Sequence, residues 1–224
     1  GDSFSQEFWQ DYLSAFLYAL GSIVVLNIAR VIVDRLVLFR FNTAKEIVGS
    51  QNVGSGAVEF GVYIGVALII ASATASTAEI VGTPDPSTLE TLLRTIIFFI
   101  LGLGVLIIYS LFYQFTTPFD IHAQIEDGNT AVGVALSGNI IAISLVTFKA
   151  VYGDFSTWEQ SIIGFLTFAI LGFILLYVVR FLVDIILLSG TRVSDELSVD
   201  RNLGVAFIES AVVVSAALVL FFSI

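Results

Sequence analysis

The sequence predicts an all-α, polytopic membrane protein whose six transmembrane helices form three tandem parallel hairpin repeats. Three observations lead to this fold class. Apolar residues make up 57% of the 224 residues and charged residues only 12%, against roughly 25% charged residues in a typical soluble domain. The apolar residues form continuous runs, without the alternation expected of a β-barrel strand. A set of polar residues also recurs at fixed intervals along the chain.

Six apolar runs account for nearly the whole chain. A helix needs about 20 apolar residues to cross a hydrocarbon core of about 30 Å. Runs of this kind lie near 12–38, 54–78, 95–117, 130–151, 160–188 and 203–224. We therefore expect a single membrane domain over residues 1–224, with hairpin repeats at approximately 12–78, 95–151 and 160–224.

An internal repeat becomes visible when the chain is aligned with itself at an offset of 150 residues. Six polar or glycine residues then match six others: Arg30, Asp34, Glu46, Asn52, Gly54 and Glu59 align with Arg180, Asp184, Glu196, Asn202, Gly204 and Glu209. A third copy lies between them, in which Asn129 matches Asn52 and apolar residues replace the charged ones. Because each copy enters and leaves on the same face, the repeats are predicted to be parallel.

The basic residues predict the orientation in the membrane. The connectors after the first, third and fifth helices, with their flanks, hold five basic residues, whereas the opposite side holds two. The first set is Arg35, Arg40, Lys45, Arg192 and Arg201, and the second is Arg94 and Lys149. The positive-inside rule therefore places the asparagine-containing turns in the cytoplasm and both termini outside.

The second helix of each predicted hairpin carries small residues four positions apart. These pairs are Gly61/Gly65, Gly138/Ala142 and Ala211/Ser215. Small residues at this spacing let helix backbones approach closely in a membrane, so we expect these three helices to form the packed centre. The alternative is the general frequency of glycine in membrane helices. Asn52, Asn129 and Asn202 precede the three helices and are predicted N-caps rather than ion ligands.

Two clusters of charged residues lie within the predicted spans. Arg30 and Asp34 are four residues apart and share a helix face, and Glu59 lies two helical turns after Asn52. We expect these three side chains to meet, and the repeat predicts the same for Arg180, Asp184 and Glu209.

Each cluster combines one arginine with two carboxylates, so its formal charge is −1. One carboxylate must therefore take a proton, recruit a cation or stay hydrated. This surplus predicts ion or proton binding, with Glu59 and Glu209 as the titrating groups and the two arginines as their partners. The alternative is a buried ion-pair network that fixes helix register, which is favoured if the two aspartates extend to the headgroups instead.

Two segments, TTPFDIHAQIEDGNTAVGVALSGN and DELSVDRNLGVAFIES, carry a turn signature. Its residues are Glu126, Asn129, Ala131 and Gly138 in the second hairpin, and Asn202, Gly204 and Ala211 in the third. On these residues the chain resembles a bacterial inner-membrane family known as domain of unknown function 350, over roughly residues 95–224. The resemblance implies paired helical hairpins in the bacterial inner (plasma) membrane, with an extra N-terminal hairpin here, and it implies no activity.

Composition excludes several classes of function. The net charge of −10 leaves no basic face for nucleic acid. The chain has no cysteine and one histidine, which argues against a zinc or thiolate site. That residue, His122, is expected to be solvated in a polar loop. No catalytic dyad or cofactor motif is present, so we expect neither a cofactor nor an enzyme.

Two hypotheses for function remain. The first is a small ion channel or a proton- or cation-coupled transporter that uses the two charged clusters. The second is a non-catalytic structural or assembly subunit of a membrane protein complex. In both cases the expected partners are the lipid bilayer and further copies of the chain or other membrane subunits, with a proton or cation added in the first.

Overall fold

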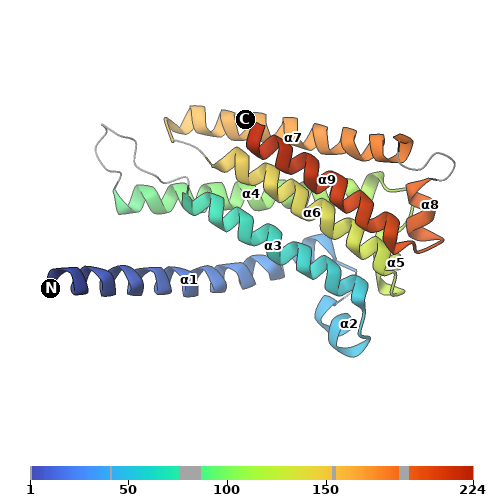
Figure 1. Ribbon diagram of the computed structural model, residues 1–224, viewed down its shortest axis with the longest axis horizontal. Coiled ribbons are helices and arrows are strands. Elements are labelled where there is room, and N and C mark those ends of the chain that lie inside the picture. Colours follow the sequence, from blue (N-terminus) through green and yellow to red (C-terminus); the bar gives the residue numbers. More distant parts are fainter. Residues whose placement is uncertain (1, 41, 76–86, 153–154, 187–191, 224) are drawn as a thin grey trace.

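A long, a short and a long helix follow one another three times along the computed structural model, which describes residues 2–40, 42–75, 87–152, 155–186 and 192–223 (Figure 1). No strand occurs among these residues, which confirms the all-α class. In order, the helices are α1 (Asp2–Val37), α2 (Thr43–Gly49), α3 (Val53–Ala75), α4 (Thr88–Thr116), α5 (Ile121–Glu126), α6 (Thr130–Val151), α7 (Trp158–Ile186), α8 (Val193–Ser198) and α9 (Leu203–Ser223).

Six helices in the described part of the chain are long and apolar enough to cross a membrane. The candidate spans are Ala15–Val37, Val53–Ala75, Thr88–Thr116, Thr130–Val151, Trp158–Ile185 and Leu203–Ser223. The six predicted runs lie on these helices, which confirms the predicted number of helices with membrane-spanning length and composition. The predicted ends at 78, 188 and 224 lie outside the described residues.

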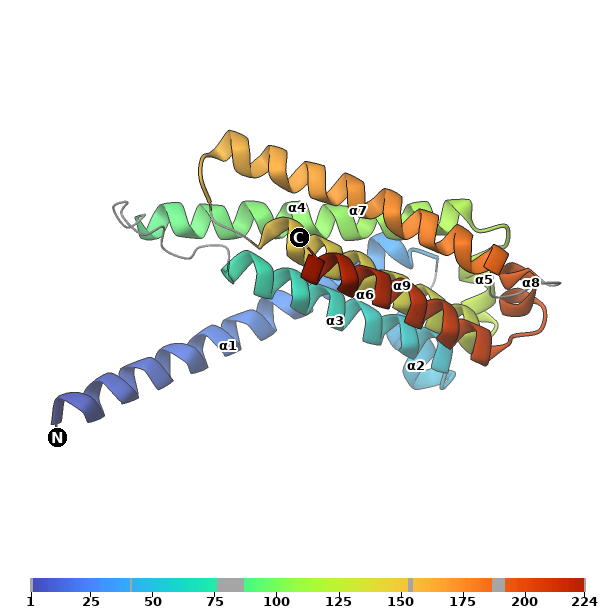
Figure 2. The same ribbon diagram turned by 45° about the horizontal axis from the view of Figure 1, so that its top comes forward.

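The helices α3, α6 and α9 form a row with α6 in the middle (Figures 1 and 2). Glycine allows the close approach of their backbones. A side chain at Gly61 would meet Ser137 of α6 at 2.6 Å, and one at Gly138 would overlap Ser210 of α9. Since lipid tails are as apolar as the helices, such close contacts are what hold membrane helices together.

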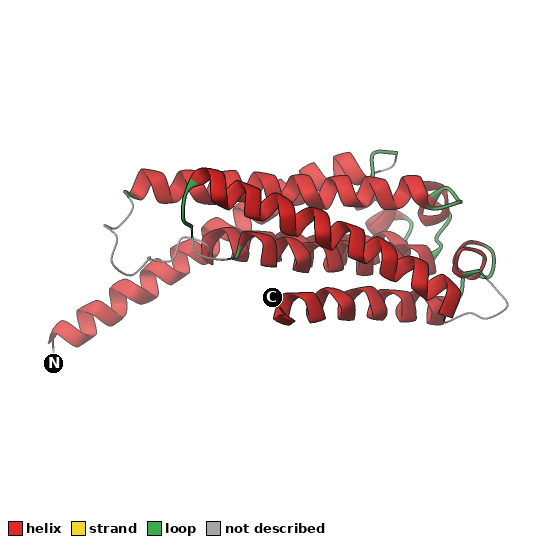
Figure 3. Ribbon diagram, turned by 90° about the horizontal axis from the view of Figure 1, so that it is seen from above, coloured by secondary structure: helices red, strands yellow, loops and turns green. Residues whose placement is uncertain are grey.

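Two further long helices, α4 and α7, pack against α6, and α7 also packs against α9. Aromatic rings fill the contact between α4 and α7, where Tyr109 and Phe112 each lie with their ring centroid 5.0 Å from that of Phe173. Figure 3 shows the long helices other than α1 lying along roughly one common axis.

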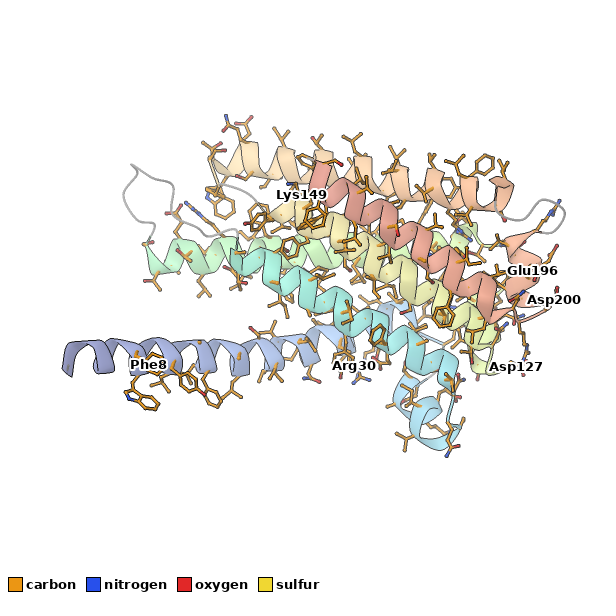
Figure 4. All side chains as sticks on the ribbon, in the orientation of Figure 1. Phe8, Arg30, Asp127, Lys149, Glu196 and Asp200 are labelled. Atoms are coloured by element: carbon orange, nitrogen blue, oxygen red, sulfur yellow. The ribbon has the colours of Figure 1, made fainter. Side chains whose placement is uncertain are left out.

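Only the second half of α1 packs against the rest of the molecule. Ala29, Val33 and Val37 are buried, whereas Trp9 and Leu17 are exposed. The first half of α1 extends away from the other helices (Figure 2). The charged residue Arg30 therefore lies where α1 meets α3 (Figure 4).

The short helices α2, α5 and α8 lie at one end of the molecule (Figure 1). Polar side chains cap the first turns of α2 and α5: Asn42 accepts from the Lys45 amide at 3.0 Å, and Asp120 accepts from the Ala123 amide at 3.1 Å. Figure 4 places Asp127, Glu196 and Asp200 at this end, which we call the short-helix end.

Candidate proton or cation site

The first charged cluster is a closed ion pair between α1 and α3. The Arg30 Nε donates to Glu59 Oε1 at 3.0 Å and to Oε2 at 2.9 Å, and its Nη2 also donates to Oε1. Glu59 is buried at 5% exposure. Both carboxylate oxygens therefore have a charged donor, which is the strong form of such a pair.

Asp34 completes the first cluster from the next turn of α1. Its Oδ2 lies 3.5 Å from Arg30 Nη2, so the arginine stands between two carboxylates. The other oxygen, Oδ1, is buried and has no hydrogen-bond partner in the described part of the chain. The structure thus brings Arg30, Asp34 and Glu59 together.

The equivalent residues on α7 and α9 are arranged differently. The distance from Arg180 Nε to Glu209 Oε1 is 3.8 Å, which is too long for a hydrogen bond. Arg180 instead donates to the hydroxyls of Thr116 at 3.3 Å and Thr117 at 2.8 Å, and its guanidinium lies 4.0 Å from the ring centroid of Tyr113. The arginine of this cluster is therefore held by the end of α4.

Glu209 is the more deeply buried of the two membrane glutamates, at 1% exposure. The Tyr113 hydroxyl lies 3.4 Å from its Oε1, close to the upper limit for a hydrogen bond. Its Oε2 has no hydrogen-bond partner among the residues that the structure describes. A buried carboxylate oxygen without a donor is costly unless a water, proton or cation satisfies it.

A cavity of about 120 Å³ lies beside this carboxylate, and Arg180, Asp184 and Glu209 all line it. Its other walls come from α4, α7 and α8 and include Thr116, Tyr177 and Ser194. A water needs only about 10–15 Å³ of such volume, so the cavity has room for several waters or a hydrated cation.

Asp184 has a different role from its counterpart Asp34. Its Oδ1 accepts a hydrogen bond from the backbone amide of Val193 at 3.0 Å, at the start of α8. The repeat predicts Asp34 and Asp184 as equivalent residues, but only the second is tied to a short helix.

The middle hairpin contributes neutral polar groups to the same region. The Tyr109 hydroxyl donates to Asn139 Oδ1 at 3.1 Å, and the Asn139 amide donates to the Ala135 carbonyl at 2.9 Å. Sequence reasoning missed these residues, and also Tyr113, Thr116 and Thr117, because no repeat or motif marks them.

The three turn asparagines cap the helices that follow them. Each side-chain oxygen accepts from backbone amides in the first turn: Asn52 from Ser55, Asn129 from Ala131 and Val132, and Asn202 from Gly204 and Val205. Their amide nitrogens serve a second purpose. Asn52 donates to the Ile125 carbonyl of α5 at 2.6 Å, and Asn129 donates to the Leu197 carbonyl of α8 at 2.8 Å. The first bond joins the start of α3 to α5, and the second joins the start of α6 to α8.

The prediction that His122 is solvated was wrong. The residue lies on α5 and is 5% exposed, with its ring 4.7 Å from that of Phe39. Its Nε2 lies 3.0 Å from the Val37 carbonyl, which only accepts, so this nitrogen carries the proton. Burial is the main cause that lowers the pKa of His122 below its ordinary 6.5.

The predicted packing residues fall into two groups. Gly61, Gly65 and Gly138 lie in tight helix contacts, and Ala142 is fully buried. Ala211 and Ser215 are exposed on the outer side of α9. No group of three or more metal-ligating residues gathers anywhere in the described ranges.

A comparison with known protein families matches residues 3–74 and 87–224 to the family described as Domain of Unknown Function (DUF350). The chain belongs to the DUF350 family. The match has two segments and includes the first hairpin, which the sequence resemblance had treated as an addition to the family. No curated protein and no solved structure matched the chain. DUF350 membership and the six apolar helices together indicate an integral membrane protein.

Proposed function

We propose that the chain consists of three tandem parallel hairpins in the bacterial inner membrane, with the short-helix end in the cytoplasm. The order of long, short and long helix, which occurs three times, supports the hairpin arrangement. The excess of basic residues in and beside the short-helix connectors supports the orientation, and it leaves both termini outside.

We further propose that the protein moves protons or small cations across the membrane, as a small channel or an ion-coupled transporter, through binding at Glu209. One observation carries this proposal: Glu209 is almost fully buried, and one of its oxygens lacks a hydrogen bond beside a cavity of about 120 Å³. The neighbouring arginine does not satisfy that oxygen, because it donates to two threonines instead.

The charges of the third cluster favour a positively charged occupant. Arg180 contributes one positive charge, and Asp184 and Glu209 contribute two negative charges, so the cluster has a formal charge of −1. Asp184 is exposed, so Glu209 is the buried carboxylate of the cluster, and its charge is unfavourable in low-dielectric surroundings unless a positive charge joins it. A proton on Glu209 or a small monovalent cation in the cavity supplies that charge.

Glu59 is the less suitable of the two buried glutamates for exchange. Glu59 receives three hydrogen bonds from Arg30, so a proton or cation that binds there has to displace an arginine. We therefore assign the ion or proton site to Glu209 and a structural role to the pair of Arg30 and Glu59.

The test is ion flux into proteoliposomes that contain the purified protein. A potassium diffusion potential drives proton entry, which an internal pH dye reports, and radioactive sodium or rubidium uptake reports cation flux. The variant Glu209→Gln should abolish the flux because glutamine has nearly the shape of glutamate but binds neither proton nor cation. The matched control Glu159→Gln, at an exposed position, should retain it.

The outcomes separate function from folding. Glu209→Gln should keep a thermal unfolding midpoint close to that of the wild type. A wild type without proton, sodium or rubidium flux would contradict the proposal, and so would a Glu209→Gln variant that carries undiminished flux.

A second candidate function is a non-catalytic structural or assembly subunit. Ion pairs between successive hairpins favour it. At the short-helix end, Arg40 pairs with Asp120 and Arg201 pairs with Asp127. Under this alternative the wild-type proteoliposomes carry no flux, and the turn residues determine which membrane subunits copurify with the protein.

A further inference from the structure

The row of α3, α6 and α9 is built from one repeated contact. Counting from the turn asparagine, the residues at positions two, nine and thirteen form what we call the small-residue face of each helix. It consists of Gly54, Gly61 and Gly65 in α3, Ala131, Gly138 and Ala142 in α6, and Gly204, Ala211 and Ser215 in α9. Positions four, eight and fifteen form the opposing face of the same helix.

The small-residue face of α3 is covered by the opposing face of α6. Side chains at Gly61 and Gly65 would each lie 2.6 Å from a serine hydroxyl of α6, Ser137 and Ser144 respectively. Gly54 similarly contacts the α6 backbone at Asn129. This contact leaves no room for a larger residue.

The same contact recurs one helix further along the row. The small-residue face of α6 is covered by the opposing face of α9, where a side chain at Gly138 would overlap Ser210. The neighbouring positions Ala131 and Ala142 are buried, at 1% and 0% exposure. The small-residue face is therefore buried in both α3 and α6, and in the same register.

The small-residue face of α9 has no such cover. Gly204, Ala211 and Ser215 are all exposed, and an added side chain at Gly204 would meet only the oxygen of Asn202 in its own turn. The face that is buried in two helices is thus open in the third.

The turn asparagine gives an independent sign of the same difference. Asn52 and Asn129 are buried, and each donates to a carbonyl of the following short helix. Asn202 is exposed and donates to Glu196 of its own hairpin, at 2.9 Å. The polar contact that accompanies each covered face is therefore missing where the face is open.

The other end of the row cannot continue the pattern. In α3 the opposing face holds Phe60, at the position of Ser137 and Ser210, and its side chain is 61% exposed. The contact at Gly138 leaves no space even for a methyl group, so a phenylalanine prevents a second copy from docking head to tail in this register. The small-residue face of α9 carries no such bulky side chain, so the same face of a second copy can approach it closely.

We propose that two copies of the chain pack α9 against α9 through this face, about a twofold axis along the membrane normal. Such a contact is isologous and closes after two copies. Both copies keep the same orientation in the membrane, and their α9 helices run parallel, as expected for packing through small residues four positions apart. The dimer covers the open end of the row of α3, α6 and α9 with a different, symmetric contact, and it does not depend on ion binding at Glu209.

Cysteine cross-linking tests the dimer directly, because the chain contains no cysteine. In membrane vesicles treated with copper phenanthroline, Ala211→Cys should form a disulfide-linked dimer that reducing agent separates. The control Val178→Cys is exposed and lies eight residues from the end of α7, as Ala211 lies eight residues from the start of α9. It should remain monomeric on the gel.

A second variant addresses the packing itself. Ala211→Leu should abolish the dimer, measured as the mass of the protein in nanodiscs, without lowering its thermal unfolding midpoint in the monomeric state. Failure of Ala211→Cys to cross-link would overturn the proposal. It would also be overturned if the double variant Ala211→Cys/Phe60→Cys formed cross-links that Ala211→Cys alone does not form, since that result indicates head-to-tail contact.

Discussion

Replacing Asn129 by alanine should destabilise the protein more than the same replacement at another helix cap. Asn129 is fully buried between the second and third hairpins. Its oxygen caps α6, and its amide nitrogen donates to the Leu197 carbonyl at 2.8 Å and to the Gln124 side chain at 2.7 Å. The alanine variant therefore loses both the cap and the link to α8.

The expected loss of stability is the sum of two contributions, the lost N-cap of α6 and the lost hydrogen bond to α8. Loss of an N-cap costs about 1 kcal/mol. A buried carbonyl left without its donor, here that of Leu197, costs about 1–3 kcal/mol. We therefore expect Asn129→Ala to lower the free energy of unfolding by about 2–4 kcal/mol. Asn42→Ala is the matched control, because Asn42 is exposed and caps α2 through a single bond to Lys45, so it should cost about 1 kcal/mol or less.

The assay is reversible unfolding in mixed micelles as the fraction of sodium dodecyl sulfate rises, followed by fluorescence of the two tryptophans. The unfolding midpoint of Asn129→Ala should lie clearly below that of Asn42→Ala. Equal midpoints would refute the reasoning, since they would mean that the bond from Asn129 to Leu197 contributes nothing beyond the cap.

Three more variants test other contacts. Gly138→Leu should destabilise by about 1–3 kcal/mol through its clash with α9, whereas Gly104→Leu, with open space around it, should unfold at the wild-type midpoint in the same assay. Because burial lowers the pKa of His122, the unfolded chain binds the proton more tightly, so stability should fall as pH drops below 6.5. His122→Gln should lose this part of the pH dependence in thermal unfolding between pH 8 and 5. Arg30→Gln should cost about 3–5 kcal/mol by leaving a buried carboxylate unpaired, and adding Glu59→Gln should recover most of that loss in denaturant titrations.

Much of the fold could be predicted from the sequence because the membrane limits the alternatives. A run of about 20 apolar residues has to satisfy its own backbone in lipid, so it forms a helix. The repeat at an offset of 150 residues also identified the charged residues that face each other across α1 and α3, and across α7 and α9. Both predictions depend on patterns that can be recognised along the chain without knowledge of tertiary contacts.

The properties of the site depend instead on tertiary contacts. The sequence presents Glu59 and Glu209 as equivalent, but Arg30 binds the first directly and Arg180 is drawn to the end of α4. His122 lies in a polar segment, yet its burial results from the contact of α5 with the end of α1. Likewise, Ala211 matches Gly61 and Gly138 in sequence, and only its place at the end of the row leaves it exposed.

The position of each hairpin in the row explains why the two clusters differ. Arg180 follows a hairpin whose first helix ends in two threonines, and these hydroxyls compete with Glu209 for the guanidinium. No hairpin precedes the first one in the described residues. Among these residues, Arg30 therefore contacts the carboxylates of Asp34 and Glu59 and the ring of Tyr63. The middle hairpin, which carries no charges at the equivalent positions, thus supplies the neutral polar groups that keep Glu209 open. The candidate site therefore belongs to the second and third hairpins together, and the third hairpin expressed alone should not form it.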